Sequence, residues 1–209
     1  MGEPAAGDLI VRRVARVFGH PRGGDGPLAV VVRNGRVAAV VPEGELARAA
    51  GQMGEVAELD AAGRAVIPGF IDAHTHLVFA GSRNMEFKAR LEGRGYAAGG
   101  IMTTVAATRA AGLPELADGV VARAEQALDA GTTTMEVKSG YGLDVEAERR
   151  CLEAVAAASS RTSVTLVPTF LGAHLDLGGG YLDLVVGEML DACAPLATSC
   201  DVFCDVGAV

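Results

Sequence analysis

From residue 65 onward, continuous apolar runs alternate with segments whose apolar residues recur at helical spacing. Such runs are typical of strands buried on both faces, and strands separated by helices imply parallel βα units. Four strands can be counted, whereas a closed (β/α)8 barrel needs eight strands and typically about 250 residues. A doubly wound open sheet is the alternative, and the count alone does not decide between them. The predicted strands lie within 65–76, 132–142, 162–174 and 200–209, and the predicted helices within 103–112, 113–131, 143–160 and 181–197.

The first 64 residues have a different pattern, that of short strands joined by tight turns. Residues 9–18 are strand-like, and residues 28–41 hold two valine-rich runs around Asn34-Gly35. This pair accepts the positive φ values of a type I′ turn and predicts a hairpin. Two more short runs flank Ala62-Gly63. Strands this short predict a small sheet or sandwich without parallel pairing.

The histidines are concentrated near the end of the first long apolar run. The chain has four, and two of them are His74 and His76. Residues i and i+2 of a strand point to the same side, so both should project together with Asp72. The carboxyl end of a strand is where parallel α/β folds place their active sites. Imidazole nitrogens are ligands of Zn²⁺ and Fe²⁺, so we predict a metal site here. The alternative is a pair of hydrogen-bonded core histidines.

Polar residues also end the next two predicted strands. His174 ends the run "VPTFLGAH", and it is a candidate for a third metal ligand or a group that contacts substrate. Lys138, Ser139 and Tyr141 end the run "TTTMEVKSGYG". Lys138 is considered as a carbamate that bridges metal ions, but we expect it to have a structural role. The fourth histidine, His20, lies in the β-type region and is not favoured as a ligand.

Arg83 and Tyr96, which follow the histidines in the sequence, are candidates for contacts with substrate. Arg83 lies in "FAGSRNMEF", which we expect to be a loop covering the site. An arginine there can hold a carboxylate bidentately, although a solvated loop arginine is the alternative. Tyr96 and the glycines after it are expected to form a mobile loop.

Composition excludes several classes of partner. The formal net charge is −8, which argues against nucleic acid and anionic membranes, because both need basic patches. No signal-peptide pattern and no apolar run of about 18 residues occurs, so we expect a soluble, cytoplasmic protein. The cysteines form no C-x-x-C pair and are predicted to be buried, reduced thiols. They are Cys151, Cys193, Cys200 and Cys204.

Several stretches carry a resemblance to known enzymes. "PGFIDAHTH" resembles the first barrel strand of the amidohydrolase superfamily, although H-x-H alone is shared by many hydrolases. "HTHLVFAGSRNMEF", "AGGIMTTVAATRAAG", "TTTMEVKSGYGLD" and "VPTFLGAH" resemble the imidazolonepropionase family within it, and "KSGYGLD" and "TFLGAH" are the more specific. The resemblance implies a (β/α)8 TIM-like barrel of the metal-dependent hydrolase type over 65–209 and a small β-sandwich domain over 1–64.

The same resemblance implies an activity and roles for single residues. The activity is hydrolysis of 4-imidazolone-5-propanoate to N-formimino-L-glutamate, a step of histidine degradation, by a water on one Zn²⁺ or Fe ion. His174 would be the catalytic group that polarises the ring carbonyl or stabilises the oxyanion. Position by position, the metal ligands would be His74 and His76, the propanoate would be held by Arg83, and the ring would be contacted by Tyr141, His174 and, as a weaker candidate, Tyr96.

The family's remaining ligands have no counterpart in this sequence. A histidine from strand five, an aspartate from strand eight and a glutamate near strand five would lie beyond Val209. We therefore expect a barrel truncated after about four strands and an incomplete sandwich. We also expect the 209-residue chain to lack full activity by itself.

Two other interpretations stay open at this point. A related amidohydrolase, such as a deaminase or another cyclic-amide hydrolase, would share H-x-H, but Arg83 and "KSGYGLD" speak against it. A non-catalytic half-barrel that binds metal weakly would expose strand edges and apolar surface, and this would favour association with a second chain. A homodimer is one form that such association can take.

Overall fold

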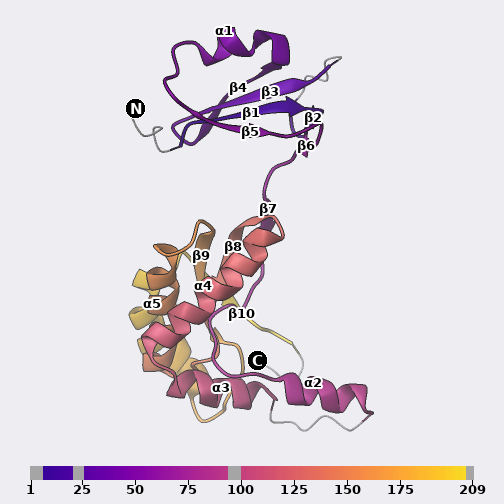
Figure 1. The fold of residues 1–209 in the computed structure, drawn as a ribbon. Coiled ribbons are helices and arrows are strands. Elements are labelled where there is room, and N and C mark those ends of the chain that lie inside the picture. The colour runs from indigo at the N-terminus through magenta and orange to yellow at the C-terminus, as the bar shows by residue number, and fades with distance from the viewer. Residues whose placement is uncertain (1–6, 21–25, 94–99, 206–209) are drawn as a thin grey trace. The chain divides into compact units, whose positions relative to one another are not determined.

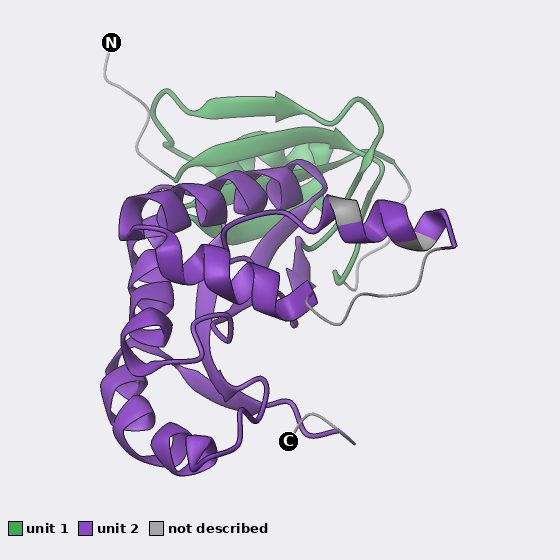
Figure 2. Ribbon diagram, turned by 90° about the horizontal axis from the view of Figure 1, so that it is seen from below, with its two compact units in different colours: residues 1–68 green, residues 69–209 purple. Residues whose placement is uncertain are grey.

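A computed structural model of the chain describes residues 7–20, 26–93 and 100–205 (Figure 1). The chain divides into two compact units, unit 1 (Met1–Pro68) and unit 2 (Gly69–Val209), coloured separately in Figure 2. Tyr96 lies outside the described residues. None of the helices within the described ranges has the length and apolar character needed to cross a membrane.

Unit 1 is built from short strands, as its sequence pattern predicts. One sheet has the strand order β4-β3-β1-β5, and a separate pair joins β2 to β6. Val11, Val14, Leu28 and Val30 form a buried cluster in this unit. Its elements are β1 (Leu9–Val14), β2 (Arg16–Val17), β3 (Leu28–Arg33), β4 (Arg36–Pro42), a 3-10 turn η1 (Glu43–Glu45), α1 (Leu46–Ala50), β5 (Ala57–Asp60) and β6 (Ala65–Val66).

The predicted hairpin is confirmed, but the expected absence of parallel pairing is wrong. β3 and β4 pair antiparallel, and the two residues that join them, Asn34 and Gly35, have φ values of 50° and 70°. β1 pairs parallel with β5, and β2 pairs parallel with β6. These pairs join segments distant in sequence, which local turn signals cannot reveal. A four-stranded sheet and a two-stranded pair do not establish the predicted sandwich.

Unit 2 has four parallel strands in the order β10-β9-β8-β7. Each strand therefore lies beside the next one in sequence, with no reversal of direction across the sheet. A doubly wound sheet reverses its strand order at a switch point, so this order is that of a barrel. The strands are β7 (Phe70–Asp72), β8 (Thr132–Lys138), β9 (Thr165–Ala173) and β10 (Ser199–Val202).

The helices of unit 2 cover the sheet and bury its core. Figure 1 shows α4 and α5 beside β8 and β9, in agreement with their contacts. Val120, Val137 and Val155 are fully buried in the cluster between these elements. The helical elements are α2 (Asn84–Leu91), α3 (Gly100–Ala110), α4 (Leu113–Asp129), α5 (Val145–Ser159), α6 (Tyr181–Leu184), a π-helical turn η2 (Val185–Met189), α7 (Leu190–Cys193) and a 3-10 turn η3 (Ala194–Leu196).

The ends of the long helices follow ordinary capping chemistry. Asp144 caps α5, because its Oδ1 accepts a hydrogen bond of 2.7 Å from the N–H of Ala147. Gly131 follows α4 with a φ of 95°, as a glycine after a helix C-terminus does. The single helix predicted for 181–197 is interrupted, because Gly187 has non-helical angles of φ −107° and ψ −111°.

Two further predictions need correction. The run 65–76 is not one strand: β6 belongs to unit 1 and β7 to unit 2, with Pro68-Gly69 between them. Proline lacks the N–H that a continuous strand would use for pairing. The prediction of buried thiols holds for Cys151 and Cys193, but Cys200 and Cys204 are exposed.

Candidate functional site

The histidine pair lies just beyond the carboxyl end of β7. Asp72 ends this strand, and its Oδ1 accepts a hydrogen bond of 3.2 Å from the N–H of His74. The next residues continue along β8, because the O of Thr75 accepts 3.0 Å from the N–H of Lys138. The hydroxyl of Thr75 also donates to the carbonyl of Glu136. The segment that carries the two imidazoles is therefore fixed to the neighbouring strand.

Aromatic rings from three strand ends meet around His76. The rings of His74 and His76 lie 5.4 Å apart between centroids. His174, which follows β9, stacks on His76 at 5.0 Å with an interplanar angle of 18°. Tyr141, which follows β8, lies 5.6 Å from His76 and 5.2 Å from His174. The structure thus brings together four of the residues that the sequence singles out.

His76 is in the protonation state that a metal ligand needs. Burial is the largest cause that lowers the pKa of this imidazole, to about 4, and the nearby His174, His74 and Lys138 lower it further. The ring is therefore neutral near pH 7. Its Nδ1 is buried and makes no hydrogen bond within the described part of the chain. A buried nitrogen without a partner is costly unless something binds it.

These properties fit a metal ion held by nitrogen. The two histidines supply imidazoles at one strand end, and His76 has an unpaired buried nitrogen. Zn²⁺ and Fe²⁺ both accept such ligands. Among the described residues, no group of three or more His, Cys, Asp or Glu side chains is placed to hold a metal. The residues present therefore fit part of a coordination sphere.

His174 is oriented by a backbone carbonyl. Its Nδ1 lies 2.8 Å from the O of Gly140. A carbonyl oxygen can only accept, so we assign the ring proton to Nδ1, which leaves Nε2 as an acceptor in the neutral ring. Burial is also the main cause that lowers the pKa of His174, although the hydrogen bond to Gly140 opposes it.

Lys138 is buried and pairs with two carboxylates. Its Nζ lies 2.7 Å from Glu136 Oε1 and 2.7 Å from Asp201 Oδ2. Burial lowers the pKa of Lys138, but the hydrogen bonds to Asp201 and Glu136 outweigh it, so the pKa is raised overall. Carbamate formation needs a neutral amine, so this environment favours the structural role. Glu136 also accepts 2.8 Å from the hydroxyl of Thr169. Sequence reasoning missed this glutamate, although its i, i+2 spacing from Lys138 predicts a shared side of β8.

A cavity of about 600 Å³ adjoins the ring cluster. Arg83 and Tyr141 both line it. Burial raises the pKa of Tyr141, and the charge of Arg83 opposes this effect, so the two groups are electrostatically coupled. Arg83 lies directly before α2 rather than in a longer loop, and its Nε pairs with Glu86 at 3.1 Å. The remaining lining residues are Phe79, Gly81, Ser82, Asn84, Thr104, Arg123 and Gln126.

Arg123 is a cavity residue that sequence reasoning missed. Its guanidinium lies 3.7 Å from the centroid of the Phe79 ring. It also donates to the carbonyls of Leu77, at 2.8 Å, and Phe79, at 3.3 Å. Arg123 therefore holds the backbone that follows His76 against α4. A residue that binds backbone atoms has no sequence signature of its own.

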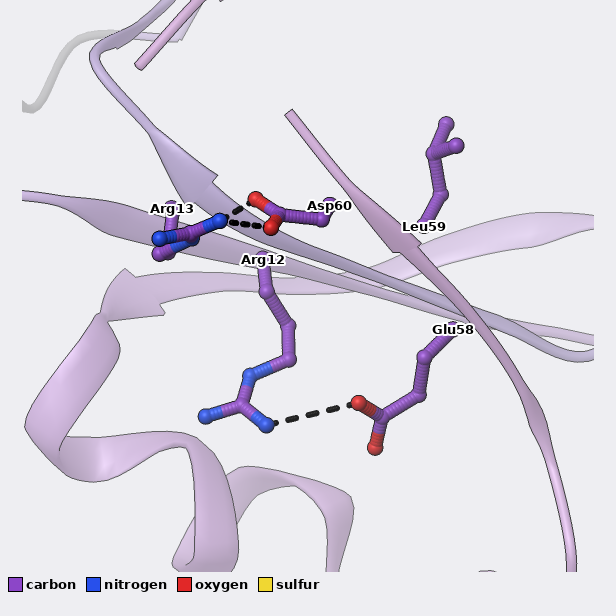
Figure 3. A pocket seen from close by; sticks show the side chains of 5 residues that line it. All are labelled: Arg12, Arg13, Glu58, Leu59 and Asp60. Atoms are coloured by element: carbon purple, nitrogen blue, oxygen red, sulfur yellow. Dashed lines mark hydrogen bonds and ion pairs between the residues drawn. The ribbon is translucent and has the colours of Figure 1, made fainter. Parts of the chain in front are cut away.

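A smaller cavity of about 300 Å³ lies in unit 1 (Figure 3). Its charged groups are paired with one another. Arg12 Nε lies 2.8 Å from Glu43, and Arg12 Nη1 lies 3.3 Å from Glu58. Arg13 pairs with Asp60 in the same way. The five residues that line this cavity include no histidine, and both of its arginines are held in ion pairs. His20 lies in unit 1, whereas the other three histidines lie in unit 2.

Comparison with known proteins agrees with this geometry. Residues 57–141 match a family model described as "Amidohydrolase family". The chain is 48% identical over 211 residues to the imidazolonepropionase of Streptomyces coelicolor, and the match covers 96% of this chain and 51% of that protein. The chain spans about half the length of the curated relatives it matches.

Solved structures with the same fold have lower sequence identity. A triazine hydrolase from Arthrobacter aurescens matches with a TM-score of 0.61 and 16% identity, over 91% of this chain and 42% of that one. Atrazine chlorohydrolase of Arthrobacter aurescens complexed with zinc matches with a TM-score of 0.57 and 19% identity, over 80% of this chain and 36% of that one. These two structures support the barrel architecture of unit 2. By its sequence and its barrel winding, the chain corresponds to the N-terminal portion of imidazolonepropionases, in the amidohydrolase superfamily.

Proposed function

We propose that this chain supplies the first metal ligands and the substrate-recognition groups for hydrolysis of 4-imidazolone-5-propanoate to N-formimino-L-glutamate. The observation that carries the proposal is the meeting of His76, Tyr141 and His174 beside a cavity that Arg83 lines. The similarity to imidazolonepropionases over nearly the whole chain supports it. The protein that contains this chain would take a small anionic substrate and act in the cytoplasm.

A metal ion would be held by the imidazoles of His74 and His76. When bound, Zn²⁺ or iron would lower the pKa of a water molecule and so supply hydroxide near neutral pH. The low pKa of His76 keeps this imidazole deprotonated for that purpose. The choice between zinc and iron follows from metal availability as much as from ligand type.

Arg83, Tyr141 and His174 would each contact a different part of the substrate. Arg83 would hold the propanoate through charge-assisted hydrogen bonds. Tyr141 keeps its proton because burial raises its pKa, so its hydroxyl can donate to a ring oxygen or nitrogen. His174 presents Nε2 as an acceptor, since Nδ1 is bonded to Gly140.

The orientation of His174 changes its expected role in catalysis. Stabilising an oxyanion requires a donor, and the neutral ring of His174 has already used its one proton on Gly140. We therefore propose that His174 accepts a hydrogen bond from a ring N–H of the substrate. It can take up a proton at Nε2 during the reaction, which is the action of a general base.

A chimera tests the proposed activity. Residues 1–209 would replace the matching N-terminal half of the Streptomyces coelicolor enzyme, and formation of N-formimino-L-glutamate would be measured with Zn²⁺ and with Fe²⁺. We expect hydrolysis of the imidazolone propanoate and little of its methyl ester, which lacks the anion. Hydrolysis of both at equal rates would favour another cyclic-amide hydrolase. A folded, metal-loaded chimera that hydrolyses neither would favour the non-catalytic half-barrel.

Substitution of Arg83 tests the carboxylate contact in the same chimera. Loss of a hydrogen-bonded charge partner typically costs about 1.5–3 kcal/mol, so Arg83→Ala should raise KM at least about tenfold with little change in kcat. Arg13→Ala is the matched control, because Arg13 lines the cavity of unit 1 and pairs with Asp60. The carboxylate contact would be wrong if KM were the same in the Arg83→Ala and Arg13→Ala chimeras.

A further inference from the structure

The turn between β8 and α5, residues 139–144, is held by a buried carboxylate. Glu148 is fully buried on α5. Its Oε2 accepts 2.8 Å from the N–H of Gly140, and its Oε1 accepts 2.7 Å from Gly142 and 2.8 Å from Leu143. Burial raises the pKa of this carboxyl, and hydrogen bonds from Ser139 and the three backbone N–H groups oppose the effect. One side chain therefore binds three of the six backbone N–H groups of the turn.

An arginine holds the acceptors of the same turn from its other side. Arg109, on α3, donates 2.6 Å from Nε to the O of Gly142 and 2.8 Å from Nη2 to the O of Leu143. Its Nε also lies 2.9 Å from Asp144 Oδ2. The N–H groups of the turn thus bind a carboxylate, and its carbonyls bind a guanidinium.

The backbone of this turn has little room to take another path. Gly140 has a φ of 111°, and a Cβ added there would lie 2.9 Å from His174 Nδ1. A Cβ on Gly142 would lie 2.5 Å from the backbone N of Glu148. Leu143 has a φ of 52°, which costs free energy for a residue with a side chain. The hydrogen bonds that Glu148 accepts and Arg109 donates offset this strain.

The turn carries two of the groups that define the candidate site. The carbonyl of Gly140 accepts from His174 Nδ1, and so sets which nitrogen of that ring carries the proton. The side chain of Tyr141 reaches His76, His174 and the cavity. A shift of this short turn would move both groups at once.

A role in stability alone does not account for Glu148. Burying a carboxylate costs on the order of several kcal/mol, and a protein with apolar residues of similar volume in place of buried ions is often at least as stable. The carboxylate is the group that can accept from three N–H donors at once, because its two oxygens have about four lone-pair sites. Its benefit is the fixed shape of the turn.

We propose that Glu148 and Arg109 are positioning residues that fix the turn 139–144, so that Gly140 orients His174 and Tyr141 faces His76. The consequence for catalysis rests on the proposed function. The orientation of His174 does not, since it can be measured without substrate or metal. Failure of one can therefore be distinguished from failure of the other.

Nitrogen NMR of the 209-residue chain tests the orientation directly. In the chain labelled with 15N-histidine, we expect His174 to show the Nδ1–H form at pH 7.5. Glu148→Gln places an NH2 group against N–H donors, so the share of the Nδ1–H form should fall measurably. Glu153→Gln on the same helix is the matched control and should leave His174 unchanged. Glu153 pairs with Arg149 away from the turn. An unchanged His174 spectrum in a folded Glu148→Gln chain would overturn the proposal.

A second variant covers the case in which Glu148→Gln does not fold. Arg109 is partly exposed, with 39% of its side chain accessible, so Arg109→Gln should fold and loosen the carbonyl side of the turn. It should change the His174 spectrum in the same direction. If Arg109→Gln gives the same His174 spectrum as the wild type and the Glu153→Gln control, the turn does not depend on Arg109 and the proposal is overturned.

Ligand binding then separates positioning from general stability. The probe is imidazole-4-propanoate, which carries the propanoate arm on a stable ring, titrated by NMR. Glu148→Gln should raise the Kd of the chain for this probe about tenfold. That is the lower end of the loss found when a residue that orients a metal ligand is replaced. In a His174→Ala background, Glu148→Gln should raise the Kd for this probe less than about twofold, because the effects of substitutions at interacting residues are not additive. An equal fold-change in both backgrounds would show that Glu148 does not act through His174.

Discussion

The two units each contain a turn in which an acidic side chain binds the backbone, and the two turns differ in how deeply that side chain is buried. In unit 1, Asp60 Oδ1 accepts 2.8 Å from the N–H of Ala62, only two residues along the chain. Ala62 and Gly63 have φ values of 48° and 78°. Arg13 pairs with the same carboxylate (Figure 3). The two charged side chains that hold this turn are both exposed.

The turn of unit 2 is held by Glu148, which is fully buried, and by Arg109, which is partly exposed. Its carboxylate, Glu148, comes from α5, and its arginine, Arg109, comes from α3. The turn of unit 1 is held by its own residues and by β1, whereas the turn of unit 2 needs two helices in place. The comparison teaches that only the second turn can transmit the packing of the fold to functional side chains.

The largest difference between the turns should appear when a methyl group is added to each. Gly142→Ala would drive a Cβ against the backbone of α5, which cannot move like a side-chain end. We expect this change to lower the free energy of unfolding of unit 2 by about 3 kcal/mol. Gly63→Ala meets no atom within 4 Å and only strains a positive φ, so we expect a cost to unit 1 of about 1 kcal/mol.

Hydrogen exchange followed by mass spectrometry measures each unit separately in one experiment. Peptides from β8 and α5 report on unit 2, and peptides from β1 and β3 report on unit 1. Equal losses from Gly142→Ala and Gly63→Ala would contradict the distinction between the two turns. A loss confined to the unit that carries each substitution would support independent unfolding of the units.

Much of the fold could be predicted from sequence because the signals are local. The alternation of strands and helices predicted all four strands of unit 2, and Asn34-Gly35 predicted the hairpin of unit 1. The parallel pairing of β1 with β5 could not be predicted, since it depends on contacts distant in sequence. The barrel winding also needed the structure, because four strands suit either arrangement.

The second comparison concerns the histidines of the two units. His76 has a buried nitrogen without a partner, so His76→Ala should raise the Kd of the chain for Zn²⁺ at least about tenfold, or about 1.4 kcal/mol. His20→Ala, in unit 1, should leave the Kd unchanged. Isothermal titration of Zn²⁺ into the two variants and the wild type gives the comparison. A Kd that responds equally to both substitutions would mean that zinc does not bind at the strand ends.

Sequence placed the site residues at strand ends but could not show how they are held. The i, i+2 rule placed His74 and His76 together, and the shared edge of parallel strands placed Tyr141 and His174 near them. Glu148, Arg109 and Arg123 escaped notice because they bind backbone atoms, and any helix residue of the right length can do so. Such contacts become visible only when the helices are in place.

The smallest expected effect is a dependence of the stability of unit 2 on pH that is caused by His76. Unit 1 does not contain His76 and should not show it. The folded pKa of His76 is about 4 against a usual 6.5, so the unfolded chain binds the proton more readily between these values. Stability from this group is therefore complete above about pH 6.5 and is lost as the pH falls toward 4.

Because His76 is only about half buried, we expect this loss to be about 1 kcal/mol rather than the full value of the shift. His174, with its lowered pKa, adds to the loss, whereas Glu148, with its raised pKa, opposes it. Both are present in a His76→Gln chain, so the difference between wild type and this variant isolates His76. Urea unfolding of the metal-free chains at pH 7 and pH 5, resolved by hydrogen exchange for each unit, provides the measurement. Parallel pH profiles for wild type and His76→Gln would show that burial does not keep this imidazole neutral.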